Sequence, residues 1–250
     1  MGEPLVEDVD GIRWITLNRP EILNATTLDD LRVITKAVND ADASVRGIVL
    51  TGAGDRAFSA GMHTDTFHKL DRQQAFDAIS VVAECLTAVR TSPKPVVARI
   101  NGYCMGAAFE MIMSADIRVA HEGVLFGLPE VKLGIPSIAD ASLLQEYVGL
   151  GFAKEFILTG DNYPATQAPL SGIVNSFVAP EDLTTETMRF MDKLAGHTPV
   201  VVAAQKDLIE TWLNTPLKVG IERSRDVFAD VFVDPATAQA VSDYRDRLKK

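Results

Sequence analysis

The sequence PVVARINGYCMGAAFE occupies residues 95–110 and decides the fold. Its first six residues are apolar apart from Arg99, and such a run is typical of a buried strand. Gly102 and Gly106 then end the run, and an apolar helical segment follows in which Glu110 is the charged residue. A carboxylate is rarely placed in such a segment without a function. The stretch therefore predicts a strand, a glycine turn and a helix that presents one carboxylate.

Outward from this stretch, strand and helix patterns alternate along the chain. Residues 11–18 alternate apolar and polar groups as a half-buried strand does, and Thr27 with Asp30 forms a capping-box pattern at the start of a helix. Repeated strand and helix units predict an α/β architecture. The other expected elements are strands at 47–51, 95–100, 117–120 and 124–127, and helices at 73–90, at 105–114 and from about residue 139.

Strand patterns end near Leu183, and helices are expected beyond it. These helices span residues 188–194, 200–213, 217–232 and 236–248. Their apolar stripes need a surface to bury against, either the sheet or another subunit. The stripe residues include Val219, Val227, Phe228 and Val231. We therefore expect a core at residues 1–182 and a helical oligomerisation region at 183–250.

The composition excludes several classes of partner. A formal net charge of -10, with no run rich in Lys and Arg, argues against nucleic acid. The N-terminal residues lack the segments of a signal peptide, and no apolar run approaches a membrane span, so we expect a cytoplasmic protein that does not bind membranes. Cys85 and Cys104 are isolated in apolar surroundings, which predicts buried reduced thiols. The four histidines are scattered, and no metal site is expected.

A second carboxylate, Glu130, follows the segment Phe126-Gly127-Leu128-Pro129. If the fold brings Glu110 and Glu130 to one cleft, one carboxyl can take a proton from water while the other gives a proton to carbon. That is the work of a hydratase.

Two glycine turns could supply hydrogen-bond donors to the same cleft. Gly61 can adopt a positive φ and aim the Met62 N–H outward, and Gly106 opens a helix whose first N–H groups are free. Two N–H groups that converge on one carbonyl oxygen form an oxyanion hole, which stabilises an enolate. The small residues at 106–108 are equally typical of close packing of helix on sheet, and that alternative stays open.

Residues 52–57 formally match the G-x-G-x-x-G/A pattern of dinucleotide sites. That motif should open a helix in the first βαβ unit, whereas this one follows a later strand and continues into Phe58-Ser59-Ala60-Gly61. We therefore exclude a dinucleotide site.

Short motifs are spaced along nearly the whole chain. They are NRP at 18–20 with LNA at 23–25, AFSAG at 57–61, KPVVA at 94–98 with NGY at 101–103, SADIRVA at 114–120, and FGLPE at 126–130 with LGIP at 133–136. Together and in this order they resemble the enoyl-CoA hydratase/isomerase (crotonase) family. The resemblance implies a crotonase-like spiral of repeated ββα units, with C-terminal helices that build trimers, often paired into hexamers.

The resemblance also implies roles for individual residues. Glu110 matches the glutamate that activates water, Glu130 matches the one that exchanges the α-proton, and the N–H groups of Met62 and Ala107 match those that hold the thioester oxygen. An acyl-CoA is the implied substrate, with no cofactor and no metal. The positions implied to line it are Leu23, Ala25, Ala60, Met62, His63, Thr64, Asp65 and Ala107.

Three positions depart from the family pattern. Phe109 stands before the first glutamate, where a small residue is common, and is expected to narrow the pocket. Asp65 would not attract CoA phosphates, although His68 and Lys69 could compensate or simply be solvated. Asp140 is either a third carboxylate at the cleft or the cap of a helix.

The two retained glutamates favour an enoyl-CoA hydratase. The alternatives are an enoyl-CoA isomerase, which can work with the second glutamate alone, a hydrolase or decarboxylase, and an enzyme that forms C–C bonds. A scaffold that binds CoA without turnover is the non-enzymatic alternative, and it has no need of both glutamates.

Overall fold

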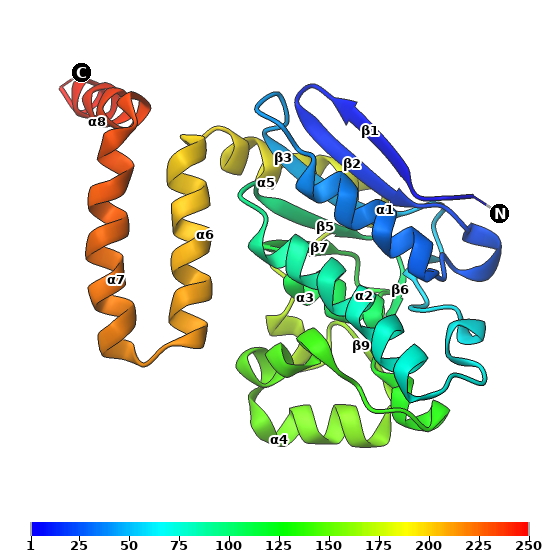
Figure 1. The fold of residues 1–250 in the computed structure, drawn as a ribbon. Helices are drawn as coiled ribbons and strands as arrows, with labels where there is room; N and C mark the ends of the chain where they lie inside the picture. Colours follow the sequence, from blue (N-terminus) through cyan, green and yellow to red (C-terminus); the bar gives the residue numbers. More distant parts are fainter. Residues whose placement is uncertain (1, 250) are drawn as a thin grey trace.

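The computed structural model describes residues 2–249, which form two β-sheets with helices around them (Figure 1). The larger sheet has the strand order β1-β2-β3-β5-β7-β10. The β1–β2 pair is antiparallel, and the other neighbouring pairs are parallel. The strands are β1 (Leu5–Val9), β2 (Ile12–Leu17), β3 (Gly47–Gly52), β5 (Val96–Ile100), β7 (Ile117–Ala120) and β10 (Ser176–Phe177).

The smaller sheet has the order β4-β6-β8-β9. Its first three strands are parallel to one another, and β9 is antiparallel to β8. The strands are β4 (Ala57–Ser59), β6 (Tyr103–Met105), β8 (Leu125–Gly127) and β9 (Asn162–Pro164).

A strand of the larger sheet, a strand of the smaller sheet and a helix follow one another repeatedly, as β3-β4-α2, β5-β6-α3 and β7-β8-α4. This arrangement confirms the expected α/β spiral of ββα units. The helices are α1 (Leu28–Asn39), α2 (Arg72–Thr91), α3 (Ala107–Ser114), α4 (Leu144–Thr159), α5 (Leu183–Ala195), α6 (Pro199–Asn214), α7 (Leu217–Asp230) and α8 (Pro235–Arg247). Short 3-10 helices include η2 (Thr64–Phe67), η3 (Pro129–Leu133) and η4 (Ala139–Leu143).

Both faces of the larger sheet are buried, which explains why its central strands are continuously apolar. Successive side chains of a strand point to opposite faces. Ile48 and Leu50 therefore belong to the main core with α1, α2 and α3, whereas Val49 packs with Leu183 and Met191 of α5. In Figure 1, α1 lies on one side of this sheet and α5 on the other.

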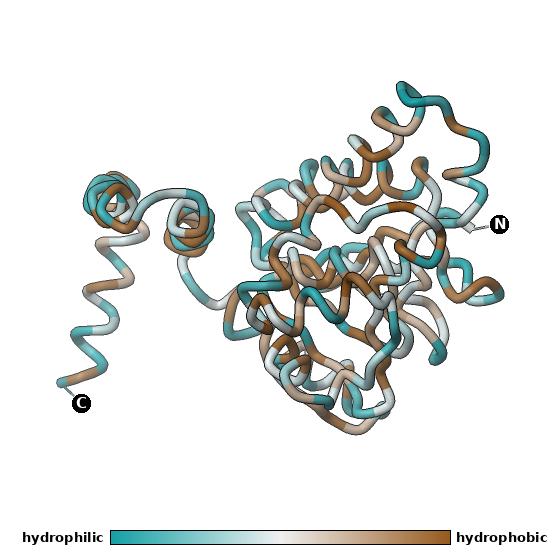
Figure 2. Tube along the Cα trace, turned by 90° about the horizontal axis from the view of Figure 1, so that it is seen from below, coloured by the Kyte–Doolittle hydropathy of each residue, from teal (hydrophilic) through white to brown (hydrophobic). Residues whose placement is uncertain are grey.

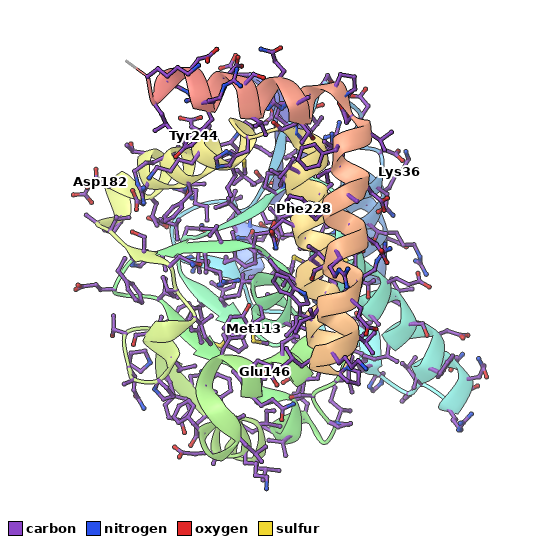
Figure 3. The ribbon with its side chains drawn as sticks, turned by 90° about the vertical axis from the view of Figure 1, so that its left-hand side faces the viewer. Lys36, Met113, Glu146, Asp182, Phe228 and Tyr244 are labelled. Atoms are coloured by element: carbon purple, nitrogen blue, oxygen red, sulfur yellow. The ribbon has the colours of Figure 1, made fainter. Side chains whose placement is uncertain are left out.

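The helices α6, α7 and α8 form what we call the C-terminal arm, which extends away from the sheets in Figures 1 and 2. Figure 3 views the molecule from the arm side and labels Phe228 of α7, which is 67% exposed. Of the predicted stripe, Val227 is buried while Val219 and Phe228 are exposed. The sheet is thus covered by α5, and the arm presents its apolar side chains to the surroundings.

Several local predictions are confirmed and some are wrong. Thr27 and Asp30 form the capping box at the start of α1. The helix expected from Met105 begins at Ala107, because Met105 is the last residue of β6. Strands of two or three residues, such as β4, β6, β9 and β10, were not predicted, since they are too short to show a period. The proposed boundary between residues 182 and 183 remains a prediction.

The packing of α5 on the sheet can be tested with Met191→Ala. Met191 is 0% exposed and its Sδ lies against Gly47 of β3, where a side chain at Gly47 would stand, so the truncation opens a cavity at the sheet. We expect a loss of about 2–5 kcal/mol in unfolding free energy by urea denaturation. Leu158→Ala, at an exposed site of α4, is the matched control and should change stability by about 0.5 kcal/mol or less. Equal losses in the two variants would contradict the packing.

Candidate active site

The site is built where the parallel strands of the smaller sheet end. The carboxyl ends of parallel strands meet at one edge, and ligands bind beyond that edge in many α/β proteins. The turn after β4 holds Ala60, Gly61 and Met62, and the turn after β6 holds Gly106 and Ala107. The segment after β8 continues to Glu130. Three segments that lie far apart in the sequence are therefore neighbours.

The two glycine turns touch each other. Gly61 has φ +89° and Gly106 has φ +56°, a region that side chains with a Cβ rarely adopt. A Cβ on Gly61 would stand 2.7 Å from the Met105 carbonyl oxygen and 3.5 Å from the Gly106 Cα. Only residues without a Cβ allow this approach.

The close turns leave two donors free. Within residues 2–249, the N–H groups of Met62 and Ala107 donate no hydrogen bond. The backbone on either side of Met62 is bonded: the Thr26 N–H donates to the Gly61 carbonyl, and the His63 N–H donates to the Thr26 carbonyl. The Ala107 N–H belongs to the first turn of α3, where such groups have no partner in the helix. The two turns therefore present the pair of N–H groups that an oxyanion hole requires.

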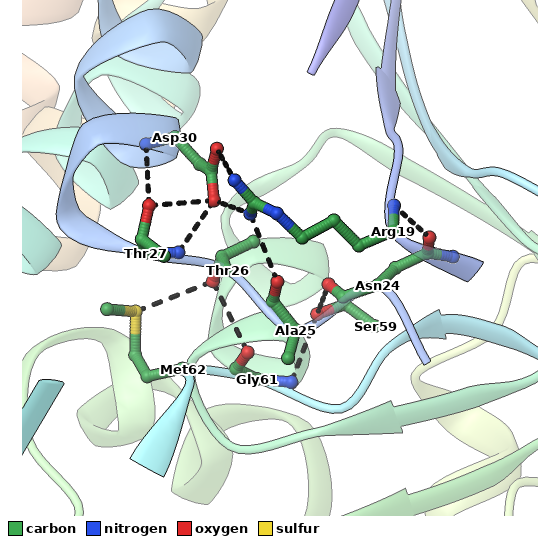
Figure 4. A network of polar contacts seen from close by, with 9 residues as sticks. All are labelled: Arg19, Asn24, Ala25, Thr26, Thr27, Asp30, Ser59, Gly61 and Met62. Atoms are coloured by element: carbon green, nitrogen blue, oxygen red, sulfur yellow. Dashed lines mark hydrogen bonds and ion pairs between the residues drawn. The ribbon is translucent and has the colours of Figure 1, made fainter. Parts of the chain in front are cut away.

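Buried neutral groups hold the first turn in place (Figure 4). The Ser59 hydroxyl donates to the Asn24 carbonyl at 2.8 Å and accepts from the Gly61 N–H at 3.0 Å. The Asn24 side-chain amide donates to the carbonyl oxygens of Ala53 and Ala57, each at 2.9 Å. These bonds link the turn to the chain before α1.

Charged and amide groups support the same framework from outside. The Arg19 guanidinium pairs with Asp30 of the α1 capping box, and also lies 3.4 Å from the Ala25 carbonyl oxygen (Figure 4). Asn101 accepts from the Gly52 N–H and donates to the Gly52 and Gly54 carbonyls. The motifs at 18–25 and 101–103 therefore hold the loop that follows β3, and this loop leads into the site.

Glu110 lies one turn into α3 and is 2% exposed. Its Oε2 has no hydrogen-bond partner among the described residues. Burial raises the pKa of this carboxyl well above its usual range, and the charges of Glu130 and Asp140 raise it further, against a lowering by the N–H groups of Ile138 and Ala141. Folding thus favours the protonated form of Glu110 more than the unfolded chain does.

Glu130 is half-buried in η3, on the other side of the glycine turns. Its Oε1 lies 2.7 Å from the position of a Cβ on Gly106, and its Oε2 accepts from the Ser137 hydroxyl at 3.0 Å. Burial raises the pKa of Glu130, partly offset by its own backbone and by Ser137. The carboxyl therefore stands directly beside the turn that presents the Ala107 N–H.

The structure brings most of the central predicted residues into one cleft of about 60 Å³. Ala60, Met62, Ala107, Glu110 and Glu130 all line it. The remaining lining residues are apolar apart from glycine: Phe67, Ile79, Val82, Gly106, Pro129, Leu133, Ile135, Pro136 and Ile138. Two carboxyls and two N–H donors thus face one apolar cleft.

Other predicted lining residues lie outside this cleft. Leu23 lines a separate hollow with Arg56, and Ala25 is buried and lines neither hollow. His63, Thr64 and Asp65 enter η2 at the surface, where the Asp65 N–H lies 3.4 Å from His63 Nδ1.

Two expectations about the site were wrong. Phe109 does not narrow the pocket. It is fully buried with Phe126 and Phe156, because a helix turns by about 100° between it and Glu110. Asp140 neither lines the cleft nor caps η4, whose N-terminus has no side-chain cap. Its carboxylate instead pairs with Arg90.

Sequence reasoning missed Ser137 and the Asn24–Ser59 support. Their partners lie 7 and 35 residues away in the chain, so no local pattern connects them.

No group of three potential metal ligands is found within residues 2–249. The loop that matches the dinucleotide pattern leads from β3 into β4 rather than into a helix, which agrees with its exclusion. Across the part of the chain that the structure describes, the helices are too short or too polar to cross a bilayer.

Comparison with known proteins gives a consistent result. The family model described as "Enoyl-CoA hydratase/isomerase" matches residues 7–250. The chain is 28% identical to the short-chain-enoyl-CoA hydratase of Clostridium acetobutylicum, covering 100% of this chain and 97% of that one. It is 31% identical to the crotonyl-CoA hydratase of Syntrophomonas wolfei, over 91% and 87% of the two chains.

The solved structures agree with the sequence matches. An enoyl-CoA hydratase subunit from Geobacillus kaustophilus superposes with a TM-score of 0.90 at 30% identity, covering 98% of this chain and 96% of that one.

The buried Glu110 carboxyl gives a pH-dependent prediction. Because folding raises its pKa above the ordinary 4.5, the stability that the protonated form provides is present at low pH and is lost as pH rises through the folded pKa. The side chain of the Glu110→Gln variant cannot ionise. Its unfolding free energy should exceed that of the wild type by little below pH 4.5 and by more toward neutral pH. The difference should reach about 1.4 kcal/mol for each unit by which folding raises the pKa of Glu110. Thermal denaturation across this pH range measures the difference.

The control for this series is Glu122→Gln, at an exposed position. It should show no such trend. A Glu110→Gln variant whose stability runs parallel to the wild type at every pH would contradict the burial of an unpaired carboxyl.

Proposed function

Because the chain belongs to the enoyl-CoA hydratase/isomerase family, we propose that it catalyses the reversible syn addition of water to a 2-enoyl-CoA thioester. One observation carries this proposal above the others: Glu110 and Glu130 face a single cleft beside two free N–H donors. Hydration needs all four groups.

The two N–H groups polarise the thioester. When the carbonyl oxygen accepts from the Met62 and Ala107 N–H groups, C3 of the enoyl group becomes electrophilic. The water oxygen bonds to C3 while Glu110 takes a water proton, and the C2–C3 π electrons move to the enolate oxygen. Each such donor typically contributes about 10²–10³ in rate.

Glu130 completes the addition by giving a proton to C2, after which the thioester carbonyl is restored. The addition leaves Glu110 protonated and Glu130 ionised, so a proton passes from Glu110 to Glu130, directly or through water, before the next turnover. One water is then consumed for each enoyl group, and no redox partner or metal is needed. Each placed carboxyl contributes about 10²–10⁴ in rate. The two carboxyls are coupled, because the charge on Glu130 raises the pKa of Glu110, so their titration belongs to the pair.

The acyl group is proposed to be short. The cleft beside the carboxyls is small and apolar, and the two named relatives are a short-chain-enoyl-CoA hydratase and a crotonyl-CoA hydratase. The CoA moiety would then extend toward Met62, His63, Thr64 and Asp65, with exposed His68 and Lys69 near its phosphates. The cytoplasmic location stays a prediction from the sequence.

One observation favours an enoyl-CoA isomerase as the second candidate. The raised pKa of the deeply buried Glu110 opposes its action as a base, and an isomerase can move the α-proton with Glu130 alone. Incubation with a series of 2-enoyl-CoAs of increasing chain length, while the conjugated thioester absorbance is followed, tests the hydratase directly. Rapid loss with short chains supports it, and stable absorbance with every member overturns it.

Substitution of Glu110 and substitution of Glu130 should affect hydration and proton exchange at C2 differently. Glu110→Gln should lower hydration by about 10²–10⁴ while solvent deuterium exchange at C2 of a saturated acyl-CoA stays partly intact, since exchange needs only a base at C2 and the oxyanion hole. Glu130→Gln should lose both reactions. Unchanged turnover in Glu110→Gln would replace the hydratase with an isomerase that uses one glutamate.

We also propose a trimer-based assembly, either a homotrimer or a hexamer. The exposed apolar side chains of the arm need a covering surface. They include Trp212, Leu213, Leu217, Ile221, Phe228, Phe232 and Val233. Light scattering at micromolar protein should give three or six times the mass of one chain. A species of one chain only would rule the assembly out.

A further inference from the structure

A chain of charged side chains links α2, η4 and α6 outside the cleft. The Arg90 guanidinium of α2 donates from Nε to Asp140 Oδ2 at 3.0 Å and pairs through Nη1 with Glu210 of α6. Asp140 is 7% exposed, and the Arg90 and Glu210 side chains are also largely withdrawn from solvent. One cation thus bridges two carboxylates that come from different parts of the chain.

Asp140 is also bonded to the helix that carries Glu110. The Ser114 hydroxyl lies 2.7 Å from Asp140 Oδ2 and 3.0 Å from the Glu110 carbonyl oxygen, so the two acceptors share its proton. Asp140 belongs to the segment at 138–141 whose Ile138 and Ala141 N–H groups face the Glu110 carboxyl. The ion pair therefore fixes two elements that surround Glu110.

The charge balance behind Glu110 depends on Arg90. The charges of Glu130 in η3 and Asp140 in η4 both disfavour the ionisation of the Glu110 carboxyl. Arg90 is the cation paired with Asp140, and it shares its charge with Glu210 of α6.

Other charges lie on the far side of this network. A hollow of about 330 Å³ beside Arg90 is also lined by Glu146 of α4 and by the pair of Lys206 and Asp116 (Figure 3 labels Glu146 and Met113 at its wall). Lys206 Nζ lies 2.6 Å from Asp116 Oδ2, so that cation is engaged with a different carboxylate. Arg90 is therefore the cation in direct contact with Asp140.

A contribution to the unfolding free energy does not by itself explain why Arg90 and Asp140 form a buried ion pair. Replacing a buried ion pair by apolar residues is often neutral or stabilising, whereas removing one partner is costly. The pair is linked through the Ser114 hydroxyl to the carbonyl oxygen of Glu110, whose carboxyl Oε2 has no hydrogen-bond partner among the described residues. A role in setting the state of that carboxyl explains the position.

We propose that Arg90 is a positioning residue for Glu110, which it serves by holding Asp140 and the segment at 138–141 in place and by neutralising the Asp140 carboxylate behind it. The inference rests on the proposed function for its catalytic meaning, because Glu110 is the group that takes the proton from water. It adds a link from α6 of the arm to the cleft, through Glu210 and Arg90.

The proposal predicts shifts of opposite sign. Arg90→Met leaves the Asp140 carboxylate without its cation, so the ionisation of Glu110 is opposed more strongly and its pKa rises. Asp140→Asn removes the negative charge but keeps an oxygen for Arg90 and Ser114, so the pKa of Glu110 falls. Each shift should be roughly one pH unit, at the low end of what a nearby charge does to a carboxyl.

Infrared difference spectroscopy measures this titration without substrate. The experiment uses the full chain in a Glu130→Gln background, so that the coupled partner is absent, and follows the protonated carboxyl C=O band as pH rises. The band that is missing when Glu110→Gln is added identifies Glu110. The double variant Arg90→Met with Asp140→Asn should return the midpoint to near that of the parent, because both charges of the pair are gone.

Lys206→Met is the matched control, since it breaks the neighbouring ion pair in the same hollow. It should lower the melting temperature and leave the Glu110 midpoint unchanged. Equal midpoints in Arg90→Met, Asp140→Asn and the parent, or shifts of the same sign, would overturn the proposal even where stability falls. Should Arg90→Met fail to fold, Asp140→Asn alone decides, since the proposal requires a downward shift there.

The pH profile of kcat/KM, in chains that retain Glu130, gives the catalytic counterpart. With Arg90→Met the acidic limb should move upward, and Arg90→Lys should restore much of the original profile. If the wild type turns over no enoyl-CoA, the proposed function fails while the infrared midpoints still test the role of Arg90.

Discussion

The contact between the turns at Gly61 and Gly106 is the constraint on which the rest of the site depends. These turns follow neighbouring parallel strands, so they point the same way and meet at the same edge. Their approach requires the absence of a Cβ, and it brings the Met62 and Ala107 backbones close together, as the proposed oxyanion hole needs. The position of Glu130 depends on it too, because its Oε1 occupies the place that a side chain at Gly106 would fill.

The supporting groups divide by charge. Around the turn at Gly61 the supporting groups are mostly neutral amides and hydroxyls, such as Asn24, Ser59 and Asn101. They form hydrogen bonds with backbone groups and carry no net charge. Behind Glu110 the supports are ionic. The Gly61 turn is thus held by uncharged hydrogen bonds, whereas the helix that carries Glu110 is tied through Ser114 to the Arg90–Asp140 ion pair.

Much of this arrangement could be predicted from the sequence. There are physical reasons why the other parts could not be predicted. Glu110, Glu130 and the two glycine turns stand out because a carboxylate in an apolar helix and a glycine at a strand end are local signals. The prediction that Phe109 narrows the pocket was wrong, because the motif indicates a role for Glu110 but not on which face of α3 the Phe109 side chain lies. The pairing of Asp140 with Arg90 joins residues 50 positions apart, so it exists only in the folded chain.

The strand order of the larger sheet has a consequence for how the chain could assemble during synthesis. From β1 to β7 the spatial order follows the order of the sequence, so each new turn of the spiral can dock on a turn that already exists. N-terminal segments can therefore gain structure while later ones are still being made. The segments that carry Met62 and Ala107 would thus be made before Glu130, which follows β8 in the third repeat. On the proposed function, the site could act only after this third repeat has docked on the first two.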